Sequence, residues 1–145
     1  MVIITGPRAK MELESETKDL KIYRDVKIKG YVPNLSDYFA VCDLAIVQGG
    51  GTTTLELTAL KRPFIYFPVE GHFEQEKIVA RRLARHQAGQ KMYFSQTTPA
   101  NLADAVTQLL QESDKVVARY AEVDTEGASR TAELIKRLAE AREVN

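Results

Sequence analysis

Three glycines, three threonines and a glutamate stand close together in the chain, between an apolar run and a helical pattern. Residues 48–56 read Gln-Gly-Gly-Gly-Thr-Thr-Thr-Leu-Glu and follow the apolar run 44–47. Glycines let a ligand approach the backbone, and the free N–H groups and positive dipole end at the start of a helix favour phosphate. Threonine hydroxyls add donors, and Glu56 adds two acceptor oxygens one turn further on. The segment 48–54, called the glycine turn below, therefore predicts a phosphate site with ribose hydroxyls near Glu56.

The same residues also fit a purely structural interpretation. In a capping box, Glu56 would accept a hydrogen bond from the backbone N–H of Thr53, and the glycines would only permit a tight turn. Neither the G-x-G-x-x-G pattern nor the G-x-x-x-x-G-K-[ST] pattern of nucleotide-binding loops is present. On local sequence both interpretations stay open, so the elements around the turn have to decide between them.

Short strands alternate with helices along the chain. Strands are expected at residues 2–5, 26–32, 44–47, 63–69 and 91–94, and helices at 35–42, 53–60, 74–85, 99–110 and 128–142. This alternation implies parallel pairing through right-handed crossovers, which gives an α/β fold with an open, Rossmann-like parallel sheet covered by helices on both faces. Ligands bind such sheets at the carboxyl ends of the strands. The glycine turn and the segments 31–34 and 69–75 all fall at that rim, so the ligand-binding interpretation outweighs the capping box.

Length, composition and charge place the chain among ordinary globular domains. Its 145 residues are 44% hydrophobic and 28% charged, so residues 1–145 are expected to form a single domain with a real core. Twenty basic and twenty acidic residues give no net charge, and the basic residues are spread along the chain. That pattern argues against nucleic acid as a partner.

Cysteine usage and hydropathy bear on the compartment. Cys42 is the only cysteine and lies in an apolar stretch, so we expect a buried, reduced thiol and a cytoplasmic protein. Neither a secretion signal nor an apolar run long enough to cross a bilayer is indicated. Peripheral association with a membrane stays open.

Four segments, in order, resemble the C-terminal, donor-binding half of GT-B glycosyltransferases. They are residues 30–34 (Gly-Tyr-Val-Pro-Asn), 43–56, 62–68 and the pair Glu74-Gln75. The resemblance covers about residues 30–110 and is closest to the MurG and UDP-glucuronosyltransferase-like branch. Any single segment is a weak signal, and their ordered spacing makes the resemblance specific.

The resemblance implies a role for each segment. Uracil would lie against 31–34, with Tyr31 stacking on the base, and the diphosphate would bind residues 50–54. Glu56 would accept the ribose hydroxyls, and Glu74 and Gln75 would bind the donor sugar. The donor-binding residues predicted in this way are Tyr31, Val32, Asn34, Gln48, Gly50, Gly51, Thr52, Thr53, Thr54, Glu56, His72, Glu74 and Gln75.

The sequence also departs from the family's pattern. Plant members carry histidine where this chain has Gln48, so Gln48 brings no charge to the diphosphate. An Asn-Ala pair follows the glutamine in the family, whereas this chain has Val79-Ala80. His72 has two interpretations, as a contact to the diphosphate or sugar and as a solvated loop histidine. His86 is expected to be structural.

The function that the resemblance implies is binding of a UDP-sugar donor for glycosyl transfer to an acceptor. The leaving diphosphate would be stabilised by backbone N–H groups and a helix dipole, with no metal and no cofactor besides the donor substrate. Catalysis would need an acceptor-binding domain or a partner subunit, so the chain alone is expected to be an inactive part of an enzyme. A UDP-sugar epimerase fragment and a non-catalytic nucleotide-binding module are the alternatives.

The family's first strand, with its own glycine-rich turn, is expected to be missing. Residues 2–6 look like the family's second strand, and the doubly wound order places strand one at the centre of the sheet. Either the strand at 2–5 closes directly against the strand at 44–47, or the unpaired edges pair between chains. The second alternative predicts a homo-oligomer.

Overall fold

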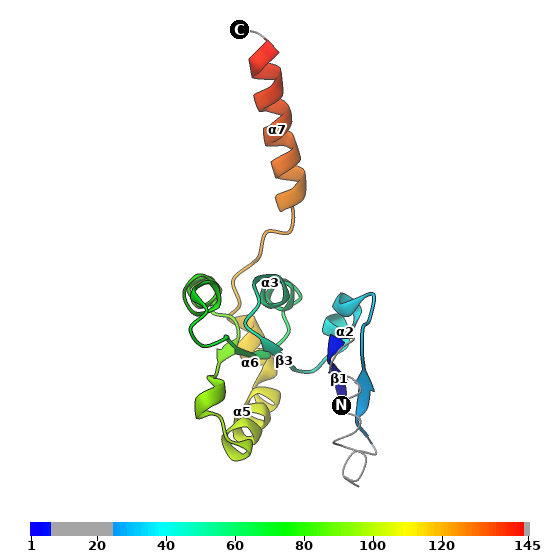
Figure 1. Cartoon of the computed structure of the whole chain (residues 1–145), viewed down its shortest axis with the longest axis vertical. Helices are drawn as coiled ribbons and strands as arrows, with labels where there is room; N and C mark the ends of the chain where they lie inside the picture. The colour runs from blue at the N-terminus through cyan, green and yellow to red at the C-terminus, as the bar shows by residue number, and fades with distance from the viewer. Residues whose placement is uncertain (7–24, 144–145) are drawn as a thin grey trace. The chain divides into compact units, whose positions relative to one another are not determined.

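The computed structural model describes residues 1–6 and 25–143 (Figure 1). The chain divides into two compact units, Met1–Tyr38 and Phe39–Asn145.

The N-terminal unit contains a two-stranded parallel sheet. Strand β1 (Val2–Ile4) pairs with β2 (Lys27–Lys29), and Ile3 lies opposite Ile28. Strand β2 is shorter than the predicted run 26–32, because the chain bends at Gly30. Helix α2 (Leu35–Val41) begins after Asn34, whose carbonyl accepts a hydrogen bond from the Asp37 N–H at 3.2 Å.

The second unit is built on a three-stranded parallel sheet. Its order is β3-β4-β5, formed by Ala45–Gln48, Phe64–Phe67 and Gln90–Lys91. The central strand β4 is apolar throughout and its first three residues are buried, as expected of a parallel strand covered on both faces. The predicted parallel pairing is confirmed.

Helices cover both faces of this sheet (Figure 1). Ile65 of β4 packs against Ala105 and Leu109 of α5 (Pro99–Gln111). On the other face the Phe64 ring meets the Tyr120 ring edge-on, with 6.3 Å between ring centroids. The predicted start of α5 is confirmed, since the Thr98 side chain caps the helix and forms a capping box with Asn101.

Two helices follow the carboxyl ends of β3 and β4. Helix α3 (Gly51–Ala59) starts two residues earlier than predicted. The predicted helix 74–85 forms, but its first part is a π-helix, η2 (Glu74–Val79), which continues into α4 (Ala80–His86). A π-helix has i→i+5 hydrogen bonds and a wider turn, so side chains along it point in other directions than a regular α-helix predicts.

Gly89 closes the connection from α4 to β5. Gln87 ends the helix in a left-handed conformation with φ 51°, and Gly89 has φ 69°. A Cβ atom on Gly89 would lie 2.3 Å from the Phe64 ring. Only glycine fits, because both the backbone conformation and the space exclude a side chain.

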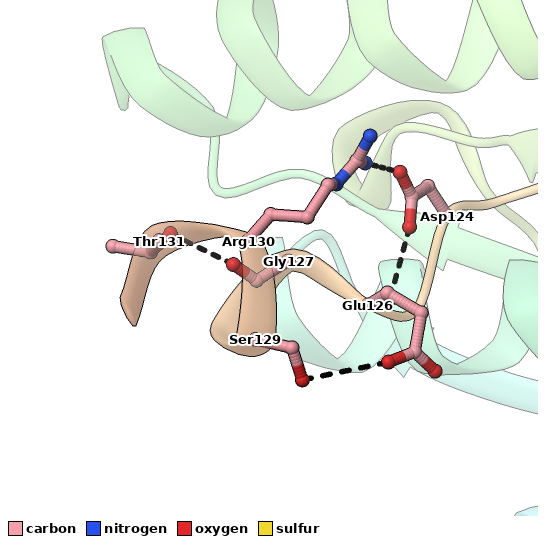
Figure 2. Close-up of polar contacts among 6 residues, drawn as sticks. All are labelled: Asp124, Glu126, Gly127, Ser129, Arg130 and Thr131. Atoms are coloured by element: carbon pink, nitrogen blue, oxygen red, sulfur yellow. Dashed lines mark hydrogen bonds and ion pairs between the residues drawn. The ribbon is translucent and has the colours of Figure 1, made fainter. Parts of the chain in front are cut away.

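The C-terminal part is helical. The predicted strand 91–94 ends at Lys91, and Phe94–Gln96 form a 3₁₀-helix, η3. A short helix that was not predicted, α6 (Ser113–Ala118), follows α5 and precedes α7 (Gly127–Glu143). Figure 2 shows how α7 begins: the Asp124 carboxylate accepts from the Glu126 N–H at 2.9 Å and pairs with Arg130. None of the helices in the described ranges is long and apolar enough to cross a membrane.

Strand β3 is an edge strand of the larger sheet. Strand β3 pairs with β4 only, and within the residues described here no other strand extends the sheet beyond it. Ile46 in the middle of β3 is 48% exposed, which is unusual for an apolar residue of a parallel strand. Self-association through such an edge stays a prediction.

Candidate functional site

The glycine turn lies against the end of β4. The Gly49 N–H donates to the Phe67 carbonyl at 2.8 Å and so continues the β3-β4 ladder, and the Gly50 N–H donates to the Gln48 carbonyl at 2.7 Å. A Cβ atom on Gly49 would lie 2.9 Å from the Pro68 Cα, closer than real contacts allow. Close approach of two backbones therefore requires glycine at this position.

The capping-box interpretation is wrong. Gly50 is the N-cap of α3, with φ −68° and ψ 142°, and no side chain caps the helix. The first helical hydrogen bond runs from the Thr54 N–H to the Gly50 carbonyl at 3.2 Å. The N–H groups of the three preceding residues, Gly51 to Thr53, therefore have no acceptor within the helix and suit an anion.

The three threonines of the turn have different environments. Thr52 is exposed and Thr53 half-buried, whereas Thr54 is fully buried. The Thr54 hydroxyl donates to the Gly50 carbonyl at 2.8 Å. Thr54 therefore supports the turn from inside, and the hydroxyls that remain nearest the surface are those of Thr52 and Thr53.

The structure brings Glu74 and Gln75 to the glycine turn. The Glu74 Oε1 lies 3.5 Å from the point that a Cβ of Gly51 would occupy, and the Gln75 Oε1 lies 3.4 Å from the corresponding point of Gly49. The same Gln75 oxygen accepts a hydrogen bond from the Val69 N–H at 2.9 Å. Both residues predicted to bind the donor sugar thus lie next to the glycine turn, and Glu74 lies next to a residue predicted to bind the diphosphate.

The other predicted residues of this unit are Glu56, Gln48 and His72. Glu56 is half-buried on α3, and its carboxylate has no hydrogen bond or ion pair to the described part of the chain. Gln48 is exposed at the end of β3. His72 is exposed, and its backbone N–H donates to the Val69 carbonyl at 3.0 Å. His86 ends α4, where its carbonyl accepts from the Ala121 N–H at 2.9 Å, a structural contact.

The residues predicted to meet uracil belong to the N-terminal unit. Tyr31 is 75% exposed, Asn34 is exposed and Val32 is half-buried. The Tyr31 phenol ring is largely exposed, as stacking on a base requires.

Arg82 is a residue of the site that the sequence reasoning missed. Its Nη2 donates to the Gly51 carbonyl and to the Thr54 Oγ1, the latter at 3.2 Å. Glu74 of η2 and Arg82 of α4 both reach Gly51. The hydrogen-bond partners of Arg82 lie 28 and 31 residues earlier in the chain, so no local sequence signal could assign Arg82 to the site.

A carboxylate ties together the two loops that follow β4 and β5. Glu70 accepts hydrogen bonds from the Ser95 N–H at 3.0 Å and the Ser95 hydroxyl at 2.9 Å. These two donors lower the pKa of the Glu70 carboxyl, because they favour its ionised form. The loop that carries His72 is therefore fixed at its start.

A separate depression lies between β4, α4 and β5. This depression of about 260 Å³ is lined by Tyr66, by the inner residues of α4 and by Lys91. It contains none of the predicted donor-binding residues. Across residues 1–6 and 25–143 there is also no group of three side chains able to hold a metal ion.

Comparison with known proteins identifies relatives among glycosyltransferases. The chain is 32% identical over 120 residues to a UDP-N-acetylglucosamine--N-acetylmuramyl-(pentapeptide) pyrophosphoryl-undecaprenol N-acetylglucosamine transferase of Desulforamulus reducens, covering 77% of this chain and 32% of the relative. It is 28% identical to a processive diacylglycerol beta-glucosyltransferase of Bacillus pumilus, covering 80% of this chain and 29% of the relative. The chain therefore spans about a third of the length of these relatives.

The fold is also similar to that of a solved structure. The structure matches a crystal structure of MurG from Acinetobacter baumannii with a TM-score of 0.72 and 16% identity, covering 93% of this chain and 41% of that chain. This likeness confirms the predicted Rossmann-like α/β fold of the GT-B class. The model of the glycosyltransferase family 28 C-terminal domain matches residues 1–138, and the chain belongs to this family.

Proposed function

We propose that this chain binds the UDP-sugar donor of a glycosyltransferase. The observation that carries the proposal is that Glu74 and Gln75 approach the glycine turn, next to the start of α3, in a chain of the glycosyltransferase family 28 C-terminal domain. An anion site and two polar side chains at its rim are what a sugar diphosphate needs.

Each part of the donor has a proposed partner. The diphosphate binds the N–H groups of Gly51 to Thr53 and the hydroxyls of Thr52 and Thr53. Glu56 has a half-buried carboxylate without a partner in the described ranges, and it accepts hydrogen bonds from the ribose. Glu74 and the amide of Gln75 bind the sugar hydroxyls, and Gln48 and His72 lie at the margin of the site. Uracil stacks on Tyr31 and meets Val32 and Asn34, as the resemblance of that segment implies.

The chemistry of this site is stabilisation of the leaving group. Cleavage of the bond between sugar and diphosphate leaves UDP with additional negative charge. Backbone N–H groups and the dipole of α3 stabilise that charge, and donors of this kind are worth roughly 10²- to 10³-fold in rate each. The proposal needs no metal and no cofactor other than the donor itself.

The acceptor and the general base come from outside this chain. Because the chain spans 32% and 29% of the two relatives, an acceptor-binding domain or partner subunit supplies the rest. Both relatives are named for lipid acceptors, an undecaprenol pyrophosphate and a diacylglycerol, which favours a lipid-linked acceptor here and peripheral contact with a membrane. The cytoplasmic location expected from the sequence is part of this proposal.

Calorimetry with UDP and ADP tests the proposal. The chain is expected to bind UDP saturably and ADP more weakly. UDP should increase the free energy of unfolding by RT ln(1 + [L]/Kd) and so raise the melting temperature as its concentration rises. Equal binding of UDP and ADP would contradict the uracil contacts, and absence of binding to either would contradict the proposed function.

A further inference from the structure

The Arg82 side chain forms hydrogen bonds with the first turn of α3. Its Nη2 donates to the Gly51 carbonyl and to the Thr54 hydroxyl oxygen at 3.2 Å. That hydroxyl in turn donates to the Gly50 carbonyl at 2.8 Å. One side chain from α4 is thus linked, directly and through Thr54, to the carbonyls of two successive glycines.

These two carbonyls set the direction of the anion-binding N–H groups. A trans peptide is planar, and its C=O and N–H point in opposite directions. The Gly50 carbonyl shares a peptide plane with the Gly51 N–H, and the Gly51 carbonyl shares one with the Thr52 N–H. Drawing both carbonyls toward Arg82 and Thr54 therefore turns the Gly51 and Thr52 N–H groups away from the protein interior.

Hydrogen bonds that order the backbone have their largest effect at glycines. Glycine has more accessible backbone conformations than any other residue type, so fixing Gly50 and Gly51 on binding would cost conformational entropy. A turn that is already ordered before the ligand arrives avoids this cost. Thr54 is fully buried and Arg82 is half-buried, so the hydrogen bonds between them are sheltered from water.

Arg82 also places a positive charge at the turn. A Cβ on Gly51 would lie 3.8 Å from the Arg82 Nη2, and the Arg82 Nε is buried without a hydrogen-bond partner in the described part of the molecule. Gln48, the last residue of β3, carries no charge. The guanidinium therefore adds to the positive end of the α3 dipole.

We propose that Arg82 is a positioning residue for the diphosphate, which orients the Gly51 and Thr52 N–H groups through the Gly51 carbonyl and Thr54. The identity of the ligand rests on the proposed function. The ordering of the turn does not, because it is a property of the free protein.

Two measurements on three variants test the proposal. Arg82→Met removes the donors and the charge, Arg82→Lys retains a cation and a donor, and the matched control Arg81→Met removes the same charge from the exposed neighbouring position. Hydrogen exchange of the Thr54 and Leu55 amides is measured without ligand, and calorimetry compares UDP with uridine, which lacks the diphosphate.

The expected pattern separates positioning from general destabilisation. Arg82→Met should speed exchange in the first turn of α3 and weaken UDP binding by about tenfold, about 1.4 kcal/mol, while uridine binding stays unchanged. Arg82→Lys should recover part of both effects, and Arg81→Met should match the wild type. If Arg82→Met does not fold, Arg82→Lys carries the test, with a smaller loss confined to UDP.

Two outcomes would overturn the positioning role of Arg82, and a third would contradict the proposed function. Equal weakening of UDP and uridine by the Arg82 variants would overturn the positioning role. Unchanged exchange in the first turn of α3 would overturn it independently of any ligand. A wild-type chain that binds neither UDP nor uridine would contradict the proposed function, while the exchange measurement would still decide whether Arg82 orders the turn.

Discussion

The side-chain oxygen of Gln75 accepts a hydrogen bond from the backbone N–H of Val69 at 2.9 Å. This contact closes the loop between β4 and η2 and brings the start of the π-helix to the glycine turn. With its oxygen so engaged, the Gln75 side chain offers its NH₂ group to a ligand. The structural contact and the proposed sugar contact thus use different atoms of one amide.

Gln75→Leu should therefore separate the donor sugar from the nucleotide. Loss of a neutral hydrogen bond costs about 0.5 to 1.5 kcal/mol, so affinity for a UDP-sugar should fall roughly two- to tenfold relative to affinity for UDP. Calorimetry with both ligands gives this ratio. An unchanged ratio would remove Gln75 from the sugar site and leave it only the loop contact.

Glu56→Gln should weaken UDP binding without lowering the melting temperature. Charge-assisted hydrogen bonds to ribose are worth roughly 1.5 to 3 kcal/mol, or on the order of tenfold to a hundredfold in affinity. Stability should be preserved because Glu56 caps no helix. The matched control is Asp104→Asn, which neutralises an exposed carboxylate on α5. If Glu56→Gln binds UDP like the control, the ribose role is wrong.

Gly89→Ala should destabilise the second unit. The added methyl meets the Phe64 ring and φ is 69°, so overpacking of about 1 to 3 kcal/mol adds to a left-handed backbone cost of about 1 to 2 kcal/mol. Gly71→Ala is the comparison, because Gly71 has φ 80° and open space around it, and should show the backbone cost alone. Urea unfolding measures both free energies, and equal losses would show that the Phe64 contact contributes nothing.

The Cys42 thiol should react slowly in the folded protein. Burial raises the pKa of Cys42 above the ordinary thiol value, outweighing the opposing effect of nearby Arg62. Because the pKa of this thiol is higher in the folded state, the bound proton stabilises the fold. This contribution to the free energy of unfolding is fully present below the ordinary thiol pKa and is lost as pH rises through the pKa of the folded state. Alkylation by iodoacetamide at pH 8 should be slower than in urea and should accelerate toward higher pH. Equal native and unfolded rates at pH 8 would contradict this shift.

Local signals predicted much of the fold. The Thr98-Pro99 pair fixes the start of α5 because capping depends on residues adjacent in sequence, and the apolar run 63–69 predicts the strand that the structure shows as β4. Strand ends were less accurate, since β2 stops at Lys29 where the chain turns before Pro33. The start of α3 differs from the prediction because the Gly49 N–H bonds to Phe67 of β4, a contact that is distant in sequence.

The candidate site likewise contains residues that the sequence predicted and residues that it did not. The glycine turn and the Glu74-Gln75 pair could be read from residue types and order, and the structure brings them together. Arg82 and the inward orientation of Thr54 depend on contacts between α3 and α4, which are 28 to 31 residues apart in the chain. The π-helix η2 has no sequence signature of its own.

The central claim is that the start of α3 binds a diphosphate. Amide resonances of the ¹⁵N-labelled chain, followed during titration with UDP and separately with uridine, test it most directly. We predict that UDP shifts the Gly51, Thr52 and Thr53 amides in a saturable way and that uridine leaves them in place. UDP-dependent shifts confined to the depression around Tyr66 and Lys91, with the three amides unmoved, would contradict the account.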